Sequence, residues 1–277
     1  MNESQIDLIS GLIMEPFLRW AGGKTWLKKE IINYLPKSFN DYHEPFLGGG
    51  SIFFFTDQVG KSFLSDINSD LIQTYIQVRD NVEEIINFLK EFKNTESDYY
   101  KIRSLNFNNP TQRAARFIYL NKTSFNGIYR VNRKGEYNVP FGYKYGTDFI
   151  HQDNLLLTSQ KLKNVELRCL DFEEAVKQVK ANDLVFLDPP YTVAHFNNGF
   201  IRYNQKLFSI QDQYRLADSL RTLNHIGAKY ILTNAFHEKI EEVFKEAGNF
   251  VPLTRMSLIG GKGAIRQSRK EYMIKNF

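Results

Sequence analysis

Short apolar segments alternate along this chain with segments whose apolar residues recur near the helical period. The expected strands span residues 42–46, 62–64, 165–170, 184–187 and 230–232. The helical spacing occurs in residues 31–35, 175–179, 214–223 and 240–244. This alternation predicts a parallel α/β sheet, whose ligands bind beyond the carboxyl ends of the strands. We therefore expect the polar residues that follow the strands, Asp66, Asp171, Asp188 and Thr233 with Asn234, to gather at one edge.

Residues 71–152 break this alternation. Two helical patterns, 72–92 and 113–120, are followed by Lys134-Gly135, a pair typical of a hairpin turn, between the expected arms 129–132 and 137–139. We interpret residues 71–152 as an inserted lobe, and residues 1–70 with 153–277 as the main domain.

The composition indicates a folded, mildly basic protein. Hydrophobic residues make up 42% of the 277 positions, and the formal net charge is +5. Part of the positive charge is local, because residues 130–144 and 262–275 each hold several Lys or Arg against a single glutamate. This balance favours an acidic partner, of which nucleic acid is the commonest.

Several classes of site are disfavoured. Cys169 is the only cysteine, so an intramolecular disulfide and a multi-cysteine zinc site are excluded, and we interpret it as a small apolar residue at a strand end. The five histidines have no paired spacing, so we predict no metal. We also expect no membrane span and no secretory signal, because no apolar run reaches about 20 residues and the N-terminus lacks a basic segment followed by an apolar one.

The sequence Asp188-Pro189-Pro190-Tyr191 follows an apolar strand and carries a specific chemistry. Its prolines stiffen the loop, which holds a carboxylate, a backbone carbonyl and an aromatic ring together. An exocyclic amine offers two N–H donors, which suit the carboxylate of Asp188 and the carbonyl of Pro189. Accepting both protons aims the nitrogen lone pair outward and stabilises the positive charge that grows as the nitrogen attacks a methyl group. Tyr191 offers a face on which a planar base can stack.

Five segments resemble, in order, the motifs of the DNA adenine methylases of the Dam type. They are residues 17–24, 44–50, 66–71, 125–130 with 138–142, and 188–191. The resemblance covers nearly the whole chain, and five ordered matches are more specific than any single one. It implies an α/β fold with a Rossmann-like methyltransferase sheet and an inserted helical and β-hairpin target-recognition domain.

The resemblance also implies S-adenosylmethionine as the cofactor. The implied cofactor contacts are Trp20, Lys24, Glu44, Phe46, Gly48, Asp66, Asp171, Phe172 and Asp188. Taken alone, Asp66 and Asp171 could each simply cap a helix, and the glycine run at 48–50 could be a plain turn. Gly22 to Thr25 is not the end of a phosphate-binding loop, because Leu18 stands where that motif needs glycine.

Double-stranded DNA is the implied substrate, and the target adenine must be flipped out of the duplex. The implied DNA contacts are Arg19, Phe125, Asn126, Ile128, Arg130, Asn138 and Pro140. Arg130 suits bidentate readout of guanine, while Ile128 and Pro140 suit a thymine methyl group, so GATC is the preferred target. Without the flanking match, a solvated cation of the hairpin would be the favoured interpretation of Arg130.

We expect direct transfer to adenine N6, with Asp188, Pro189 and Tyr191 as the catalytic residues. Methylation of cytosine C5 would need a cysteine nucleophile, usually within a Pro-Cys pair, whereas Cys169 follows Arg168. Methylation of cytosine N4 more often has Ser at the first position of the motif, so Asp188 favours adenine. The alternatives are an amine methyltransferase that acts on RNA or protein, and a catalytically silent DNA-binding protein on the same scaffold. The resemblance further implies a cytoplasmic, bacterial or phage-encoded monomer, and leaves open a cognate restriction endonuclease as a partner.

Overall fold

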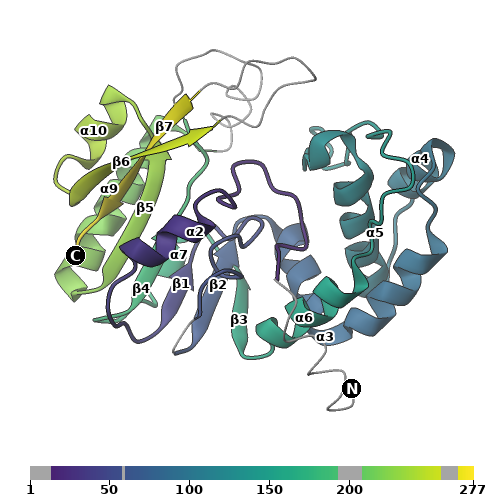
Figure 1. Ribbon diagram of the computed structural model, residues 1–277, viewed down its shortest axis with the longest axis horizontal. Coiled ribbons are helices and arrows are strands. Elements are labelled where there is room, and N and C mark those ends of the chain that lie inside the picture. Colours follow the sequence, from purple (N-terminus) through teal and green to yellow (C-terminus); the bar gives the residue numbers. More distant parts are fainter. Residues whose placement is uncertain (1–13, 58–59, 193–207, 257–267) are drawn as a thin grey trace. The chain divides into compact units, whose positions relative to one another are not determined.

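The computed structural model describes residues 14–57, 60–192, 208–256 and 268–277 (Figure 1). The helices are α2 (Lys28–Ile31), η1 (Ile32–Tyr34), α3 (Ser69–Glu91), α4 (Glu96–Ser104), α5 (Pro110–Thr123), η2 (Phe125–Gly127), α6 (Gln152–Leu162), α7 (Phe172–Val176), α9 (Ile210–Ile226) and α10 (Glu238–Phe244). The strands are β1 (Tyr42–Glu44), β2 (Ser62–Asp66), β3 (Val165–Cys169), β4 (Leu184–Leu187), β5 (Lys229–Ala235), β6 (Asn249–Met256) and β7 (Ser268–Lys275).

The strands form a seven-stranded sheet in the order β3-β2-β1-β4-β5-β7-β6. β1 runs parallel to β2 and β4, and β4 runs parallel to β5. The α/β class and the five expected strands are confirmed. Thr233 and Asn234, however, lie inside β5 rather than after it.

The expected parallel arrangement holds for β1, β2, β4 and β5, and two strands that were not expected, β6 and β7, add an antiparallel part. β7 pairs antiparallel with both β5 and β6, so the sheet is mixed. The sequence pattern did not reveal β6 and β7, because β7 begins with three exposed residues, among them Arg269 and Lys270, and only its second half is buried. The remainder of the cationic stretch, residues 262–267, lies outside the described residues.

The chain divides into two compact units. Unit 1 comprises residues 1–28, 48–57 and 68–169, and unit 2 comprises residues 29–47, 58–67 and 170–277. The expected target-recognition lobe, 71–152, lies inside unit 1, and its boundaries stay a prediction.

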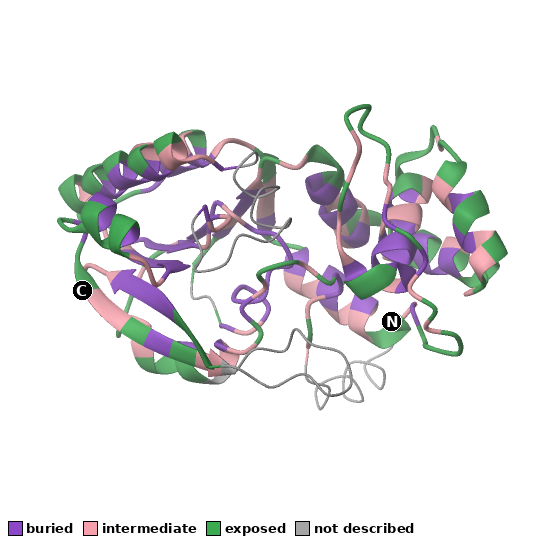
Figure 2. Cartoon of the chain, turned by 90° about the horizontal axis from the view of Figure 1, so that it is seen from above, coloured by how far each residue is buried: buried purple, intermediate pink, exposed green. Residues whose placement is uncertain are grey.

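Unit 2 is built around β4 and β5. All four residues of β4 are buried, as expected of a strand covered on both faces, whose sequence reads as a continuous apolar run. α9 begins with a capping box between Ser209 and Asp212 and ends at Gly227, whose φ of 79° suits a left-handed cap. Figure 2 shows the buried stripes along the helices and the exposed residues on their outer faces.

Unit 1 is mainly helical. α5 starts at a strong signal, because the Asn109 side chain accepts from two backbone N–H groups and Pro110 occupies the first turn. The expected hairpin turn forms: Asn132 N–H donates to the Glu136 carbonyl, and Gly135 N–H to the Asn132 carbonyl. Its arms, residues 129–132 and 137–139, are joined by an isolated bridge between Val131 and Tyr137 and do not form the continuous strands that were expected.

Candidate functional site

Three carboxylates mark the carboxyl ends of adjacent strands in unit 2. Glu44 ends β1, Asp66 ends β2 and Asp188 directly follows β4, in the sheet order β2-β1-β4. The sheet order changes direction between β1 and β4, and open α/β sheets bind ligands at such a point. Of the residues expected at one edge, Asp66 and Asp188 are therefore found there, and Glu44, which was not among them, lies there too. Glu44 is buried and accepts a 2.7 Å hydrogen bond from the Tyr42 hydroxyl.

The Asp188 carboxylate is oriented from β5. The Thr233 hydroxyl, which is completely buried, donates to Asp188 Oδ1 at 2.7 Å. Pro189 is buried and Asp188 is partly exposed, so the carboxylate stands at the edge of the core. A hydrogen bond from a rigid strand fixes the carboxylate before any substrate arrives.

A second set of buried polar residues holds the chain that follows Tyr191. Asn234 Nδ2 donates to Gln213 Oε1 at 2.9 Å, and Gln213 Nε2 donates to the Thr192 hydroxyl at 2.9 Å. Thr192 in turn donates to the Phe208 carbonyl. The loop that carries Asp188 is thus connected to both α9 and β5.

The Tyr191 ring is held by its hydroxyl. This hydroxyl donates to Glu271 Oε2 at 2.7 Å, and Arg255 Nε donates to the other oxygen, Glu271 Oε1, at 2.5 Å. Burial, followed by the charges of Glu271 and Asp188, raises the pKa of Tyr191 well above its usual value. The phenol therefore stays protonated and keeps donating.

Asp171 acts as a helix cap in unit 2. Its Oδ1 accepts from Glu173 N–H at 3.0 Å and from Arg215 Nη2 at 2.8 Å. The neighbouring Phe172 is 4% exposed and stacks on Phe46 at 5.3 Å between ring centroids. The capping role that the sequence left open is present, and a cofactor contact by Asp171 or Phe172 stays a prediction.

In unit 1, Trp20 packs on the glycine loop, residues 48–50. A Cβ at Gly48 would lie 2.6 Å from Trp20 Cδ1, and the φ of Gly48 is +47°, so glycine is needed there for space and for conformation. The Trp20 ring also stacks on Tyr129 at 5.6 Å. Lys24 is 3% exposed, and its Nζ donates to the Gly22 carbonyl at 3.1 Å.

The expected DNA-contacting turn, residues 125–127, is η2 of unit 1. Phe125 is 52% exposed, and Asn126 adopts a φ of 55°. Phe125 N–H donates to the Pro140 carbonyl at 2.9 Å, and Gly142 N–H donates to the Thr123 carbonyl at 2.8 Å. These bonds bring the turn beside residues 140–142.

Arg130 is exposed and is held by Asn138. Arg130 Nε donates to Asn138 Oδ1 at 2.8 Å, and Arg130 Nη2 to the Asn138 carbonyl at 3.3 Å. The backbone of Ile128 is fixed as well, because its carbonyl accepts from the Tyr137 hydroxyl at 2.7 Å. The seven expected DNA contacts all belong to unit 1.

Some residues that shape these sites escaped the sequence interpretation. They are Asn121, Tyr129, Thr192, Gln213, Arg255 and Glu271. The available signals were weak: Asn121 directly follows three apolar residues of a helix, and Glu271 is the single acid in a basic stretch. A buried polar residue in an apolar pattern indicates a hydrogen-bonding role but does not identify the partner.

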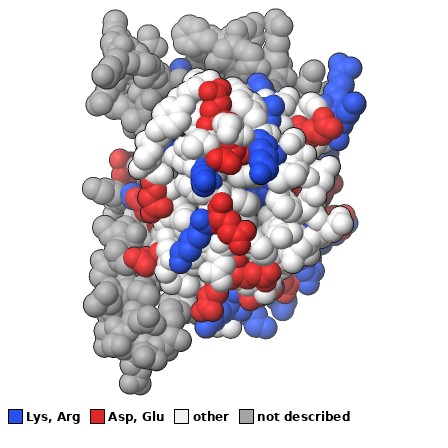
Figure 3. Space-filling view, turned by 90° about the vertical axis from the view of Figure 1, so that its right-hand side faces the viewer, with Lys and Arg blue, Asp and Glu red and all other residues white. Residues whose placement is uncertain are grey.

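Residues 14–57, 60–192, 208–256 and 268–277 contain no group of three or more His, Cys, Asp or Glu that could hold a metal ion. None of the helices in these ranges is both long and apolar enough to span a bilayer. On the face shown in Figure 3, Lys and Arg are interspersed with Asp and Glu, so that face is not a single basic patch.

Comparisons with known proteins cover most of the chain. The model of the D12 class N6 adenine-specific DNA methyltransferase family matches residues 20–258. The type II methyltransferase M.MjaIII of Methanocaldococcus jannaschii is 36% identical, over 95% of this chain and 99% of its own length. The type II methyltransferase M1.LlaDCHI of Lactococcus lactis subsp. cremoris is 33% identical, over 95% and 96%. A DNA adenine methylase of Haemophilus influenzae is 35% identical, over 75% and 74%. The solved structure of a precorrin 8w decarboxylase from Methanobacterium thermoautotrophicum covers 96% of both chains at 14% identity, and its TM-score of 0.41 is too low to add to these matches.

Proposed function

Because the chain belongs to the D12 class N6 adenine-specific DNA methyltransferase family, we propose that it methylates a flipped adenine within GATC in double-stranded DNA, with S-adenosylmethionine as the methyl donor. That it is an adenine-specific DNA methyltransferase follows from the family. The observation that carries the proposed mechanism is the Asp188 carboxylate, fixed by the buried Thr233 hydroxyl and followed by Pro189 and Tyr191.

We propose that Asp188 and the carbonyl of Pro189 accept the two N–H groups of adenine N6. The amine then becomes more tetrahedral, and its lone pair is directed away from both acceptors. When bound, S-adenosylmethionine supplies an electrophilic methyl group on a sulfonium. As positive charge develops on N6, the carboxylate stabilises it in a position set before the reaction begins. Tyr191 stacks on the base, and its hydroxyl bond to Glu271 keeps the ring in place.

The carboxylates at the sheet edge fit this cofactor as hydrogen-bond acceptors. S-adenosylmethionine carries hydroxyl donors on its ribose and a positive charge on its sulfur. Carboxylates at the ends of β1, β2 and after β4 supply acceptors and negative charge. Within unit 2 we propose that Asp66 accepts from the ribose hydroxyls, that Glu44 and Phe46 line the site, and that Asp171 and Phe172 lie near the adenine moiety.

Within unit 1 we propose cofactor contacts from Trp20, Lys24 and Gly48. The Lys24 ammonium suits the methionine carboxylate, and the glycine loop lets the backbone approach a ligand closely. Trp20 supports that loop directly, through its contact with Gly48.

The GATC proposal rests on the reading side chains of unit 1. Arg130 is held by Asn138 in a fixed orientation, which favours bidentate pairing with guanine O6 and N7. Ile128 and Pro140 offer apolar contact for the thymine methyl group, and Arg19 supplies a cation for the outer guanine. We assign Phe125 to the space that the flipped base leaves and Asn126 to the adjacent phosphate.

The activity test uses purified protein, labelled S-adenosylmethionine and an unmethylated plasmid. We expect label in DNA and protection from an endonuclease that is blocked by adenine methylation in GATC. Labelled plasmid that stays fully cuttable would contradict GATC but keep the enzyme, whereas label in RNA or protein would support the alternative substrates.

Asp188→Ala should abolish transfer and keep DNA binding, and Asp218→Ala, which changes an exposed acid on α9, is the matched control. Sedimentation of the active protein tests the further proposal that it is a monomer.

Arg130→Ala should lose about 1–3 kcal/mol of discrimination at one guanine. Arg133→Ala, which removes another exposed cation of the hairpin, should weaken binding similarly on all sequences. Equal weakening on every duplex by Arg130→Ala would instead make Arg130 a phosphate contact.

A further inference from the structure

We propose that Asn121 is a positioning residue for sequence recognition: it holds Arg19 and the recognition turn, residues 125–127, in one fixed arrangement. The proposal rests on the DNA contacts proposed above for Arg19 and for the turn. Asn121 itself is 1% exposed in the last turn of α5, so it does not touch DNA.

The hydrogen bonds of Asn121 bind Arg19 through its backbone. Asn121 Oδ1 accepts from Arg19 N–H at 2.8 Å, and Asn121 Nδ2 donates to the Arg19 carbonyl at 2.8 Å. One side-chain amide thus pairs with both backbone groups of a residue 102 positions away, as a neighbouring strand would. This pairing fixes both the position and the orientation of the Arg19 backbone.

The same amide reaches the recognition turn. Asn121 Nδ2 also donates to the Gly127 carbonyl at 3.2 Å. Both N–H bonds of the amide are therefore used, one on Arg19 and one on the turn, and the carbonyl oxygen completes the set. Shortening or inverting this side chain would release the two segments from each other.

The packing of Gly127 against Arg19 supports the same conclusion independently. A Cβ at Gly127 would lie 2.5 Å from Arg19 Cδ and 2.7 Å from Arg19 Cβ, and the φ of Gly127 is +65°. The stem of Arg19 therefore lies directly on the turn. Arg19 remains exposed, so its charged end is presented at the surface by a stem and a backbone that are both fixed.

The recognition turn is fixed on its other side by residues 140–142. Phe125 N–H donates to the Pro140 carbonyl, and Ser124 forms a bridge with Phe141. We call the side chains proposed to contact bases, Arg19, Ile128, Arg130 and Pro140, the reading surface. Within it, Arg19 depends on Asn121 for its position, whereas Pro140 is bonded directly to the turn through Phe125 N–H. This predicts a loss of discrimination confined to the base pair that Arg19 contacts.

The test measures single-turnover methylation of the cognate duplex and of duplexes that carry one substituted base pair each. Asn121→Ala should reduce discrimination at the base pair read by Arg19 about tenfold and leave the other positions unchanged. Arg19→Ala should do the same, and the double variant should lose no more than Arg19→Ala alone. Thr111→Ala is the matched control, because Thr111 is also buried on α5 but bonds to Gln77 and not to Arg19 or the turn.

Asn121→Asp keeps the experiment decisive if Asn121→Ala does not fold. It preserves size and the acceptor for Arg19 N–H, but it turns a carboxylate oxygen towards the Arg19 and Gly127 carbonyls, and it should show the same confined loss. Wild-type discrimination in a folded Asn121 variant, or an equal loss at all positions, would overturn the inference. Wild-type discrimination in Arg19→Ala would instead refute the proposed role of Arg19, so the two failures are distinguishable.

Discussion

Replacing Glu271 with glutamine should weaken both the fold of unit 2 and the methyl transfer in which we propose that Tyr191 takes part. The Glu271 carboxylate is 4% exposed and accepts from two donors, the Tyr191 hydroxyl at 2.7 Å and Arg255 Nε at 2.5 Å. Glutamine retains one acceptor oxygen and turns an NH₂ group towards the second donor. When the amide oxygen keeps the Arg255 bond, the NH₂ group faces the Tyr191 hydroxyl, which can then only accept from it, so the bond that Tyr191 donates to a charged acceptor is lost.

The magnitude follows from the charge of the acceptor. Hydrogen bonds to charged groups contribute about 1.5–3 kcal/mol to stability, so Glu271→Gln should lower the free energy of unfolding by about that amount. Tyr191→Phe removes the same bond from the other side and should cost a similar amount. The double variant should therefore cost at least about 1 kcal/mol less than the sum of the single variants.

Urea unfolding of the wild type, the two single variants and the double variant measures the coupling energy between Glu271 and Tyr191. Single-turnover methylation shows whether loss of the hydroxyl bond slows methyl transfer. Tyr119→Phe is the control, because its hydroxyl donates to the neutral Lys93 carbonyl at 2.7 Å. It should cost about 1 kcal/mol and show no coupling to Glu271. Additivity within about 0.5 kcal/mol, together with an unchanged transfer rate in Glu271→Gln, would refute the reasoning.

The pKa of Tyr191 gives this coupling a pH range. The pKa is raised in the folded state by burial, Glu271 and Asp188. The stabilisation is therefore complete below the pKa of an unfolded tyrosine, about 10, and is lost as the pH rises above it. The same coupling energy is expected at pH 7 and at pH 9.

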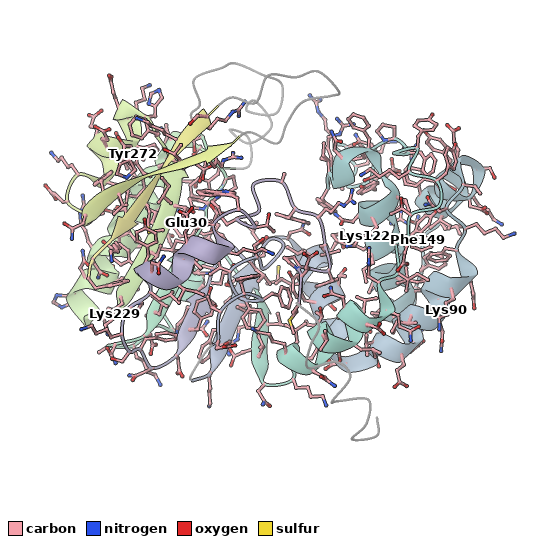
Figure 4. All side chains as sticks on the ribbon, in the orientation of Figure 1. Glu30, Lys90, Lys122, Phe149, Lys229 and Tyr272 are labelled. Atoms are coloured by element: carbon pink, nitrogen blue, oxygen red, sulfur yellow. The ribbon has the colours of Figure 1, made fainter. Side chains whose placement is uncertain are left out.

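Three further predictions concern single side chains. Thr233→Val, which keeps shape but removes the donor to Asp188, should slow methyl transfer about tenfold without changing DNA binding, and Thr233→Ser should restore the rate. Lys122 lies on α5 (Figure 4), and burial lowers the pKa of its ammonium group to about 8. Between pH 7 and 9 the folded chain releases this proton while the unfolded chain keeps it, so stability should rise by about 1 kcal/mol in the wild type and not in Lys122→Met. Arg215→Met should cost about 1 kcal/mol of unfolding free energy at low salt and less at high salt, because its ion pairs with Asp171 and two further acids are partly exposed.

The parts of the fold that sequence could predict are those with a local signal. Residues 184–187 form β4 as expected, because a strand buried on both faces is a continuous apolar run. β7 has no such signal, since its pairing with β5 and β6 is between distant segments and its first residues are exposed and charged. The position of Glu271 beside Tyr191 depends on that pairing, so the motif at 188–191 identified the ring but not what holds it.

The same limit applies to the reading surface. The motifs at 125–130 and 138–142 identified exposed side chains, whose chemistry can be inferred residue by residue. Their arrangement depends on buried or half-buried polar groups, because the hairpin arms form only isolated bridges. Asn138 holds the Arg130 guanidinium, the Tyr137 hydroxyl holds the Ile128 backbone, and Asn121 holds the Arg19 backbone. Where few backbone bonds connect the arms, each of these side chains carries a larger share of the rigidity, so recognition should be sensitive to residues that never contact DNA.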